Sequence, residues 1–242
     1  MIFLCFSSKD RYTIAESILY HLKNYGLDTW YDYHTLLLGD NKFDENLKNG
    51  VQKCKYAILM ISPNFYNCKC GNMELEVIKL LYDYNQIHVF PILYNVTADE
   101  LPKEYNWIKD IIYNELTPDT PSLPTCNQIV CKILKEEINT HNYTGLKSLK
   151  HTDVFIKKIL NTYYDMDEKN LNSRITLLYC LYIYLKNGDL NPLELSCSRI
   201  LEQLFKYTKL NLEISFKEMI IAEFALTILI NERGRHIENL SN

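Results

Sequence analysis

The chain has 242 residues, of which 47% are hydrophobic and 23% charged, and its formal net charge is −4. These values are typical of soluble globular proteins, and an acidic balance without a basic stripe argues against a nucleic-acid partner. Glycine is scarce at 7 residues, and the common glycine-rich phosphate loops, GxGxxG and GxxxxGK followed by Ser or Thr, do not occur.

The cysteines and the apolar runs indicate in which cellular compartment the protein is expected. Eight cysteines are too few for a disulfide scaffold in a chain of this length. The N-terminal residues lack a basic region followed by a long apolar core, so no signal peptide is predicted. The longest apolar runs, 177–185 and 219–230, are too short to span a bilayer. We therefore expect a cytoplasmic protein with reduced thiols and no membrane partner.

The first 140 residues alternate between short apolar runs and helical patterns. The runs expected to be strands are 2–6, 27–31, 55–62 and 88–95, with a weaker one within 107–116. The helices expected between and after them are 13–26, 43–54, 73–85 and 126–139. Pro91, inside the fourth run, indicates an irregularity or a place near a sheet edge. This alternation predicts a doubly wound α/β domain with a parallel sheet and helices on both faces.

The pattern changes at about residue 142, where a polar linker begins. After it only helical patterns occur, at 152–164, 169–186, 192–207 and 215–233. Pro192 is well placed to start the third of these helices. We therefore expect two domains, an α/β domain over 1–141 and a small all-α bundle over 142–242.

Four blocks in the first domain carry a resemblance to a known family. They are FLCFSSKDR (3–11), GLDTWYDYHTLLLGDN (26–41), FDENLKNGVQKCKYAILMISPNF (43–65) and HVFPILYNVTADELP (88–102). In this order they resemble the conserved boxes of TIR (Toll/interleukin-1 receptor homology) domains. The resemblance implies a flavodoxin-like sheet of five parallel strands in the order 2-1-3-4-5. It does not extend past the linker.

That strand order predicts where a ligand would bind. In open α/β sheets, ligands bind beyond the carboxyl ends of the strands where the strand order reverses, here between the first and third strands. The loops at that point contain FSSKD (6–10) and SPNFYNCKCGNME (62–74). The loop over 32–41 follows the second strand and lies beside them.

Glu74 is the candidate catalytic residue. Enzymatic members of the family cleave NAD with a glutamate early in the third helix, in a pattern W-x-x-x-E-L, and CGNMEL (70–75) is similar to it. Cys70 takes the place of the aromatic residue, so another ring, such as Phe65 or Tyr66, would have to fill that space. The structural alternative is that a glutamate in the first turn of helix 73–85 only favours the helix dipole. Glu76 lies about 200° further around the helix and points elsewhere.

The chemistry implied by the resemblance needs one well-placed carboxylate. Breaking the bond between nicotinamide and ribose develops oxocarbenium character, as in glycoside hydrolysis, and a nearby carboxylate stabilises that charge. Attack by water gives ADP-ribose, and attack by another atom of the same nucleotide gives a cyclic ADP-ribose. NAD is thus the expected substrate, and no cofactor is expected.

Other candidate substrate-binding residues come from the same blocks. Phe6, Ser7 and Lys9 match family positions near the nucleotide, although the Ser-Ser-Lys-Asp stretch could simply cap the next helix. Asp32 and Cys70 complete the set, Asp32 as a ribose contact. Trp30 is expected in the core.

The CxC pair of Cys68 and Cys70 offers only two of the four ligands that a structural zinc site needs, so no metal is expected.

Two functions remain open from the sequence. The first is an NAD-consuming enzyme that makes ADP-ribose or a cyclic ADP-ribose signal in immune, anti-phage signalling, with a downstream effector reading a cyclic product. The second is a non-enzymatic adaptor that works by TIR–TIR assembly. In both, self-association through the TIR domain is expected, with the helical domain as a second candidate surface.

Overall fold

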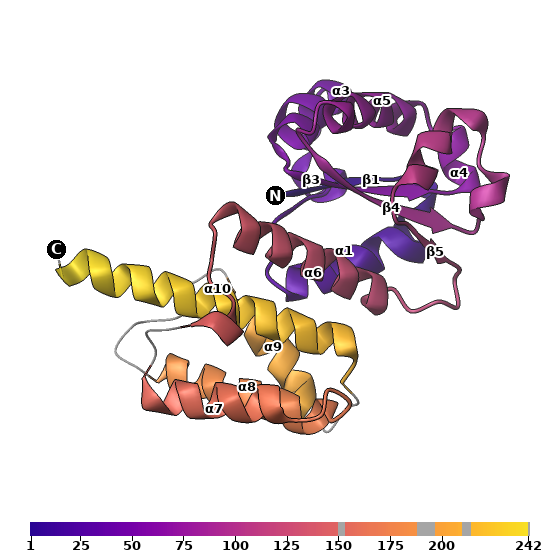
Figure 1. Cartoon of the computed structure of the whole chain (residues 1–242). Coiled ribbons are helices and arrows are strands. Elements are labelled where there is room, and N and C mark those ends of the chain that lie inside the picture. Colours follow the sequence, from indigo (N-terminus) through magenta and orange to yellow (C-terminus); the bar gives the residue numbers. More distant parts are fainter. Residues whose placement is uncertain (150–152, 188–196, 210–213, 242) are drawn as a thin grey trace. The chain divides into compact units, whose positions relative to one another are not determined.

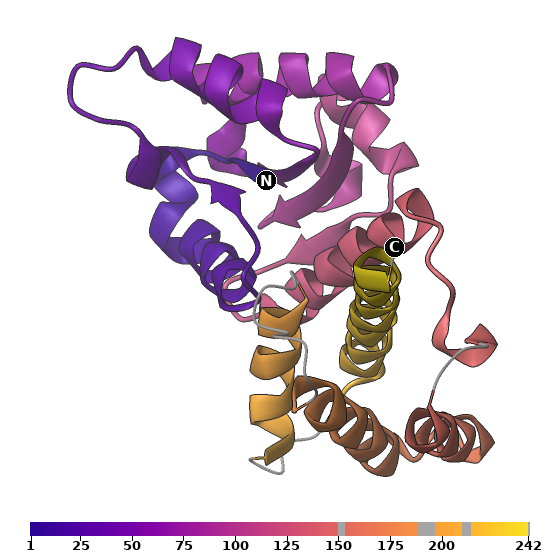
Figure 2. The same ribbon diagram turned by 90° about the vertical axis from the view of Figure 1, so that its left-hand side faces the viewer.

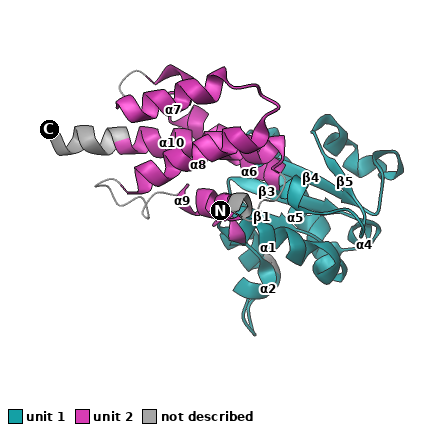
Figure 3. Ribbon diagram, turned by 90° about the horizontal axis from the view of Figure 1, so that it is seen from below, with its two compact units in different colours: residues 1–23, 27–126 teal, residues 24–26, 127–242 magenta. Residues whose placement is uncertain are grey.

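The computed structural model describes residues 1–149, 153–187, 197–209 and 214–241. The chain forms two compact units, one of residues 1–23 and 27–126, the other of residues 24–26 and 127–242 (Figure 3). The domain boundary expected at 141/142 stays a prediction.

The first unit is built on a five-stranded parallel sheet in the order β2-β1-β3-β4-β5. The strands are β1 (Ile2–Cys5), β2 (Thr29–Trp30), β3 (Tyr56–Ile61), β4 (His88–Tyr94) and β5 (Asn114–Leu116) (Figure 1). Every residue of β1 and β3 is buried, as the uniformly apolar runs predict for central strands. The predicted fold class and strand order are confirmed.

Helices cover both faces of this sheet. Figure 1 shows α5 (Lys69–Asp83) on one face and α1 (Glu16–Asn24) on the other. Six of the shorter helical elements of the unit are η1 (Ser8–Asp10), η2 (Arg11–Ala15), α2 (Asp32–Thr35), α4 (Pro63–Tyr66), η5 (Ala98–Glu100) and η6 (Lys103–Asp110). Helix α6 (Leu123–Thr140) begins in this unit and continues in the second.

The helix expected over 43–54 is irregular. It consists of α3 (Lys42–Glu45), a π turn η3 (Asn46–Gly50) and a 3₁₀ turn η4 (Val51–Lys53). A side chain at Gly50 would place its Cβ 2.7 Å from the ring of Phe3 and 2.9 Å from the indole nitrogen of Trp30. Glycine is therefore required where this turn approaches the sheet.

The fifth strand is shorter than the run that predicted it. Residues 107–110 belong to the 3₁₀ helix η6 and only Asn114–Leu116 pair with β4. The 3₁₀ period brings Tyr105 and Ile108 to the same side, and both are buried. The pairing of β4 with β5 starts at Ile92, directly after Pro91. Pro91 therefore has no partner in β5, and the backbone N–H that proline lacks is not needed for that pairing.

The second unit is helical. After η7 (Leu146–Ser148) it contains α7 (Val154–Asp165), α8 (Leu171–Lys186), α9 (Ser198–Lys209) and α10 (Phe216–Ser241) (Figure 2). Helix α10 packs against α8 and α9, and α7 packs against α8. The predicted start of the third helix at Pro192 lies outside the described residues. Within the described parts of the chain, no helix combines the length and the apolar character that crossing a membrane requires.

Candidate active site

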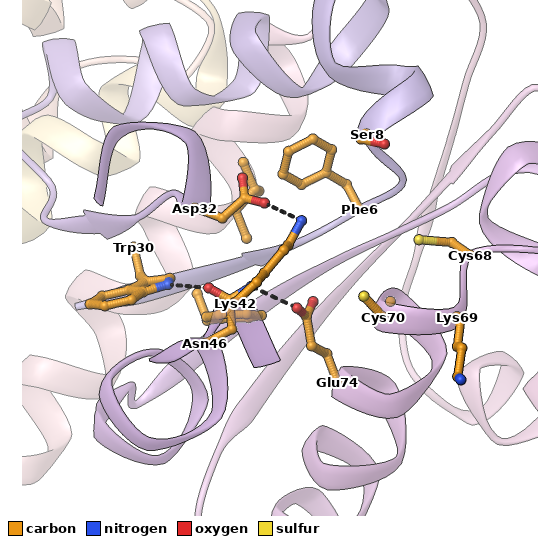
Figure 4. Close-up of a pocket in the computed structure, with 13 residues that line it drawn as sticks. Phe6, Ser8, Trp30, Asp32, Lys42, Asn46, Cys68, Lys69, Cys70 and Glu74 are labelled. Carbon is orange, nitrogen blue, oxygen red and sulfur yellow. Dashed lines mark hydrogen bonds and ion pairs between the residues drawn. The ribbon is translucent and has the colours of Figure 1, made fainter. Parts of the chain in front are cut away.

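A cavity of about 170 Å³ lies where β1, β2 and α5 meet (Figure 4). Its lining residues are Phe3, Leu4, Phe6, Ser8, Trp30, Asp32, Lys42, Asn46, Cys68, Lys69, Cys70, Gly71 and Glu74. Because β1 and β3 are neighbours while the chain order reverses between them, the cavity is at the topological switch point of the sheet. The position predicted from the strand order therefore contains a cavity.

Glu74 is buried at the wall of this cavity, with 5% of its surface exposed. Its Oε1 accepts a hydrogen bond of 2.8 Å from the side-chain amide of Asn46. Helix α5 begins at Lys69, earlier than the sequence pattern predicts, so Glu74 lies in the second helical turn and not the first. The interaction with the helix dipole, which falls off within the first turn, therefore does not explain this glutamate.

The surroundings of Glu74 act on its charge in opposite directions. Burial raises the pKa of Glu74, while the hydrogen bond from Asn46, the thiol of Cys5 and the charge of Lys42 lower it, and the net shift is upward. Burial, with the charge of Glu74, raises the pKa of Cys5 well above its ordinary value. Cys5 therefore stays a neutral thiol beside the carboxylate.

Asp32 and Lys42 form an ion pair at the cavity, with Lys42 Nζ 2.7 Å from Asp32 Oδ2. Burial opposes the charged form of Lys42, but the hydrogen bond and charge of Asp32 outweigh it and raise the pKa of the lysine. The second oxygen of Asp32, Oδ1, is buried and has no hydrogen-bond partner among the residues that the structure describes. Asp32 thus leaves one acceptor unused at the cavity wall.

At the start of α5 the cavity wall carries two cysteine side chains and no aromatic ring. Cys68 and Cys70 both line the cavity (Figure 4). Phe65 is fully buried in the core, and Tyr66 packs on Tyr105 with ring centroids 5.5 Å apart. Neither ring lines the cavity, so neither replaces the missing aromatic residue; the cavity's rings come from Phe3, Phe6 and Trp30.

Four of the candidate site residues, Phe6, Asp32, Cys70 and Glu74, line this one cavity. Ser7 is buried and is the N-cap of η1. Its hydroxyl accepts a hydrogen bond of 3.4 Å from the backbone N–H of Lys9.

Neither Ser7 nor the exposed Lys9 is among the lining residues, and Ser8 lines the cavity instead. Glu76 is exposed, in agreement with its predicted direction, and Trp30 both packs on the core and lines the cavity.

Lys42 and Asn46 were not predicted as site residues. Lys42 is exposed at the start of α3, whereas Asn46 is buried at the start of η3, four residues before Gly50, which approaches the sheet.

Asp10 ties together the two loops that approach the cavity from β1 and β3. Its carboxylate accepts hydrogen bonds from the hydroxyl of Ser62 and from the amide of Asn64, the latter at 2.7 Å. The same Ser62 hydroxyl accepts from the backbone of Phe65 at 3.1 Å and caps α4. The loop that leads into α5 is thereby held against the loop after β1.

In the described part of the chain, no group of three or more His, Cys, Asp and Glu side chains could hold a metal ion.

Comparison with known proteins places the chain in a family. A family model described as TIR domain matches residues 2–123, about half of the 242 residues, so the chain belongs to the TIR domain family.

Two curated relatives have names that state an activity. An NAD(+) hydrolase, TcpC, of Escherichia coli O6:H1 is 32% identical over 110 residues, which cover 45% of this chain and 35% of that protein. A probable 2′ cyclic ADP-D-ribose synthase, TcpO, of Methanobrevibacter olleyae is 31% identical over 102 residues, covering 42% of this chain and 29% of that protein. The matched regions thus span about a third of these relatives' length.

Among solved structures, the TIR domain of the Toll-related receptor TRR-2 from Hydra magnipapillata is similar, with a TM-score of 0.43 and 19% identity. The match covers 57% of this chain and 97% of that one.

Proposed function

We propose that this protein consumes NAD by cleaving the bond between nicotinamide and ribose, with Glu74 as the catalytic carboxylate. The observation that carries the proposal is the placement of a buried, hydrogen-bonded glutamate at the wall of the switch-point cavity. The names of the relatives, NAD(+) hydrolase and probable 2′ cyclic ADP-D-ribose synthase, support the same reaction class.

In this reaction nicotinamide leaves as a neutral molecule with the electron pair of the broken bond. Positive charge then develops on C1 of the ribose, and the carboxylate of Glu74, which is itself buried, stabilises it. Water adds to C1 and releases a proton, which gives ADP-ribose, nicotinamide and H⁺. A nucleotide atom that attacks in place of water gives a cyclic ADP-ribose with the same proton balance. A single group of this kind contributes about 2.7–4 kcal/mol to lowering the barrier.

Other cavity residues supply binding groups for NAD. The unused Oδ1 of Asp32 can accept a hydrogen bond from a ribose hydroxyl, and the ammonium of Lys42 can pair with the diphosphate. Pockets for molecules of drug size are about 300–1,000 Å³, so the cavity of 170 Å³ takes one end of the dinucleotide as it stands.

The finer proposal is that the product acts as a signal in immune, anti-phage defence inside the cytoplasm, with activity dependent on self-association. An effector that reads a cyclic product belongs to this proposal. The alternative function, a non-enzymatic adaptor, would leave Glu74 without a role in any reaction.

The decisive experiment incubates the purified chain with NAD and separates the products by chromatography, at low concentration and with a crowding agent. Glu74→Gln is the test variant, and Glu76→Gln, which changes an exposed glutamate two residues away, is its matched control. We expect the wild type and Glu76→Gln to release nicotinamide and Glu74→Gln to lose at least about 100-fold in rate. An inactive wild type under both conditions favours the adaptor, and equal activity of all three refutes the role of Glu74.

A further inference from the structure

Three side chains from three separate elements form a hydrogen-bonded chain that ends at Glu74. The indole Nε1 of Trp30, at the end of β2, donates to Asn46 Oδ1 at 3.1 Å. Asn46 Nδ2, at the start of the π turn η3, donates to Glu74 Oε1 on α5 at 2.8 Å. Figure 4 draws both hydrogen bonds as dashed lines. Asn46 has 2% and Glu74 5% of its surface exposed, so both groups are largely shielded from solvent.

The chemistry of the first group in this chain determines the orientation of the second. An indole N–H can only donate a hydrogen bond, so the atom of Asn46 that faces it must be the amide oxygen. The amide nitrogen then necessarily faces Glu74, and a nitrogen donor is the partner that a carboxylate anion needs. A flipped amide would place two acceptors against each other and leave the indole N–H without a partner.

We propose that Asn46 is a positioning residue for Glu74, and that Trp30 holds the Asn46 amide in the orientation that presents a donor to the carboxylate. The inference rests on the proposed function in so far as Glu74 is the group that acts on NAD. Asn46 itself need not touch the substrate, because its effect passes through the carboxylate.

The other groups that face Glu74 do not replace this donor. Cys5 on β1 is a neutral thiol, a weak donor whose sulfur also lies 3.7 Å from the carbonyl oxygen of Gly71. Lys42 on α3 is charged, but its ammonium is bound to Asp32, and 46% of the lysine side chain is exposed to solvent. Asp32, the first residue of α2, is itself an anion, and its charge raises the pKa of Glu74. Asn46 is therefore the principal group that stabilises the charged form of this buried carboxylate.

The backbone around Asn46 is shaped to keep this arrangement. The π turn places Asn46 and Gly50 at its two ends. The backbone at Gly50 comes so close to Trp30 that a Cβ would lie 2.9 Å from the indole nitrogen. The same turn thus confines the indole and supplies the amide that it orients.

The test compares Asn46→Leu and Trp30→Phe with Asn49→Leu as the matched control. Asn49 lies in the same turn, and its amide also donates to a glutamate, Glu45, but it does not line the cavity. One readout is the pH profile of NAD consumption. A second readout, without NAD, is the titration of the Glu74 carboxyl carbon by ¹³C NMR, with the signal assigned by its absence in Glu74→Gln.

Without the Asn46 donor, the charged form of the Glu74 carboxyl is less stable relative to its protonated form. We expect the acidic limb of the pH profile and the NMR titration of Glu74 to move upward by about 1 pH unit in Asn46→Leu. Trp30→Phe should shift both in the same direction by a smaller amount, and Asn49→Leu should shift neither.

The outcomes separate the two proposals. A wild type that consumes no NAD refutes the proposed function, while the NMR titration still decides the role of Asn46. An active, folded Asn46→Leu with an unmoved limb and unmoved titration refutes the positioning role. If Asn46→Leu does not fold, Trp30→Phe decides, since it keeps Asn46 and removes only the group that orients the amide; an unmoved titration there also refutes the inference.

Discussion

Lys42 and Asp32 stand at the two ends of the segment between β2 and α3, and their ion pair of 2.7 Å joins these ends. Between them the segment carries Leu37 and Leu38, which are 75% and 108% exposed. The pair therefore closes a loop beside the cavity, and the charged Lys42 side chain lines the cavity.

Removal of this charge should affect substrate binding more than folding. We expect Lys42→Ala to raise the KM for NAD several-fold with a smaller effect on kcat, because the cation for the diphosphate is lost. The free energy of unfolding should change by at most about 1 kcal/mol, as for other partly exposed ion pairs. Lys48→Ala, which removes an exposed pair with Asp44 of 3.7 Å, is the control and should change neither constant. An unchanged KM in Lys42→Ala would contradict the expected contact.

The charged form of Glu74 should lower the free energy of unfolding. Folding raises its pKa, so the folded state binds more protons than the unfolded state between the two pKa values, and stability falls as pH rises through that window. At neutral pH, Glu74→Gln should therefore stabilise the fold by about 1 kcal/mol, or about 2–4 °C in Tm. This stabilisation by Glu74→Gln should become smaller as the pH is lowered toward ~4, because Glu74 of the wild type is then also protonated and neutral. Thermal melts of both proteins across this range measure it, with Glu76→Gln as the exposed control; a lower Tm of Glu74→Gln at neutral pH would contradict the sign.

Gly71 should be essential for the start of α5. A Cβ at this position would lie 2.7 Å from the ring of Phe65, which is fully buried and has no room to retreat. We expect Gly71→Ala to destabilise the first unit by about 1–3 kcal/mol through overpacking. Urea titration monitors the loss. Gly145→Ala is the control, because a Cβ there meets nothing within 4 Å, and an equal effect of both substitutions would argue against the clash.

Glu223 should hold α7 to α10 in the helical unit. Its two carboxylate oxygens accept hydrogen bonds from Tyr163 at 3.0 Å and from Tyr164 at 2.9 Å. Burial raises the pKa of Tyr163 to about 12, the charge of Glu223 adds to this and that of Arg174 opposes it, so the hydroxyl stays protonated and donates across the physiological range. We expect Glu223→Ala to destabilise this unit by about 2–4 kcal/mol and Glu223→Gln to lose less. Hydrogen exchange of α7 reports the loss; exchange rates as slow as in an exposed control, Glu168→Ala, would refute it.

The sequence predicts those parts of the site that lie at strand ends. Apolar runs mark β1 and β3 because both are fully buried, and their order places the following loops together. Asp32 and Glu74 follow from that placement and from the family pattern. Asn46 does not, because a π turn inserts an extra residue per turn, and the helical period of 3.6 then no longer tells which side chains face the sheet.

The missed 3₁₀ helix has a related cause. Within 107–116 the apolar residues suit a strand, but Tyr105 and Ile108 meet the core at a spacing of three, and this tertiary contact decides the conformation. The sequence alone indicates that Cys70 stands where the family has an aromatic residue. It does not indicate that Phe65 is fully buried against Gly71, because that contact depends on the three-dimensional packing.

Trp30 is one of only two tryptophans in the chain, and the side-chain amide of Asn46 links its indole to Glu74 through two hydrogen bonds. The other, Trp107, packs on Tyr82 and lies outside the cavity lining. In a Trp107→Phe background, the tryptophan fluorescence would arise from Trp30 alone, and its emission would follow the electric field of the nearby carboxylate of Glu74. The molecule thus contains an intrinsic spectroscopic probe through which protonation or occupancy of the cavity can be followed in real time without a label.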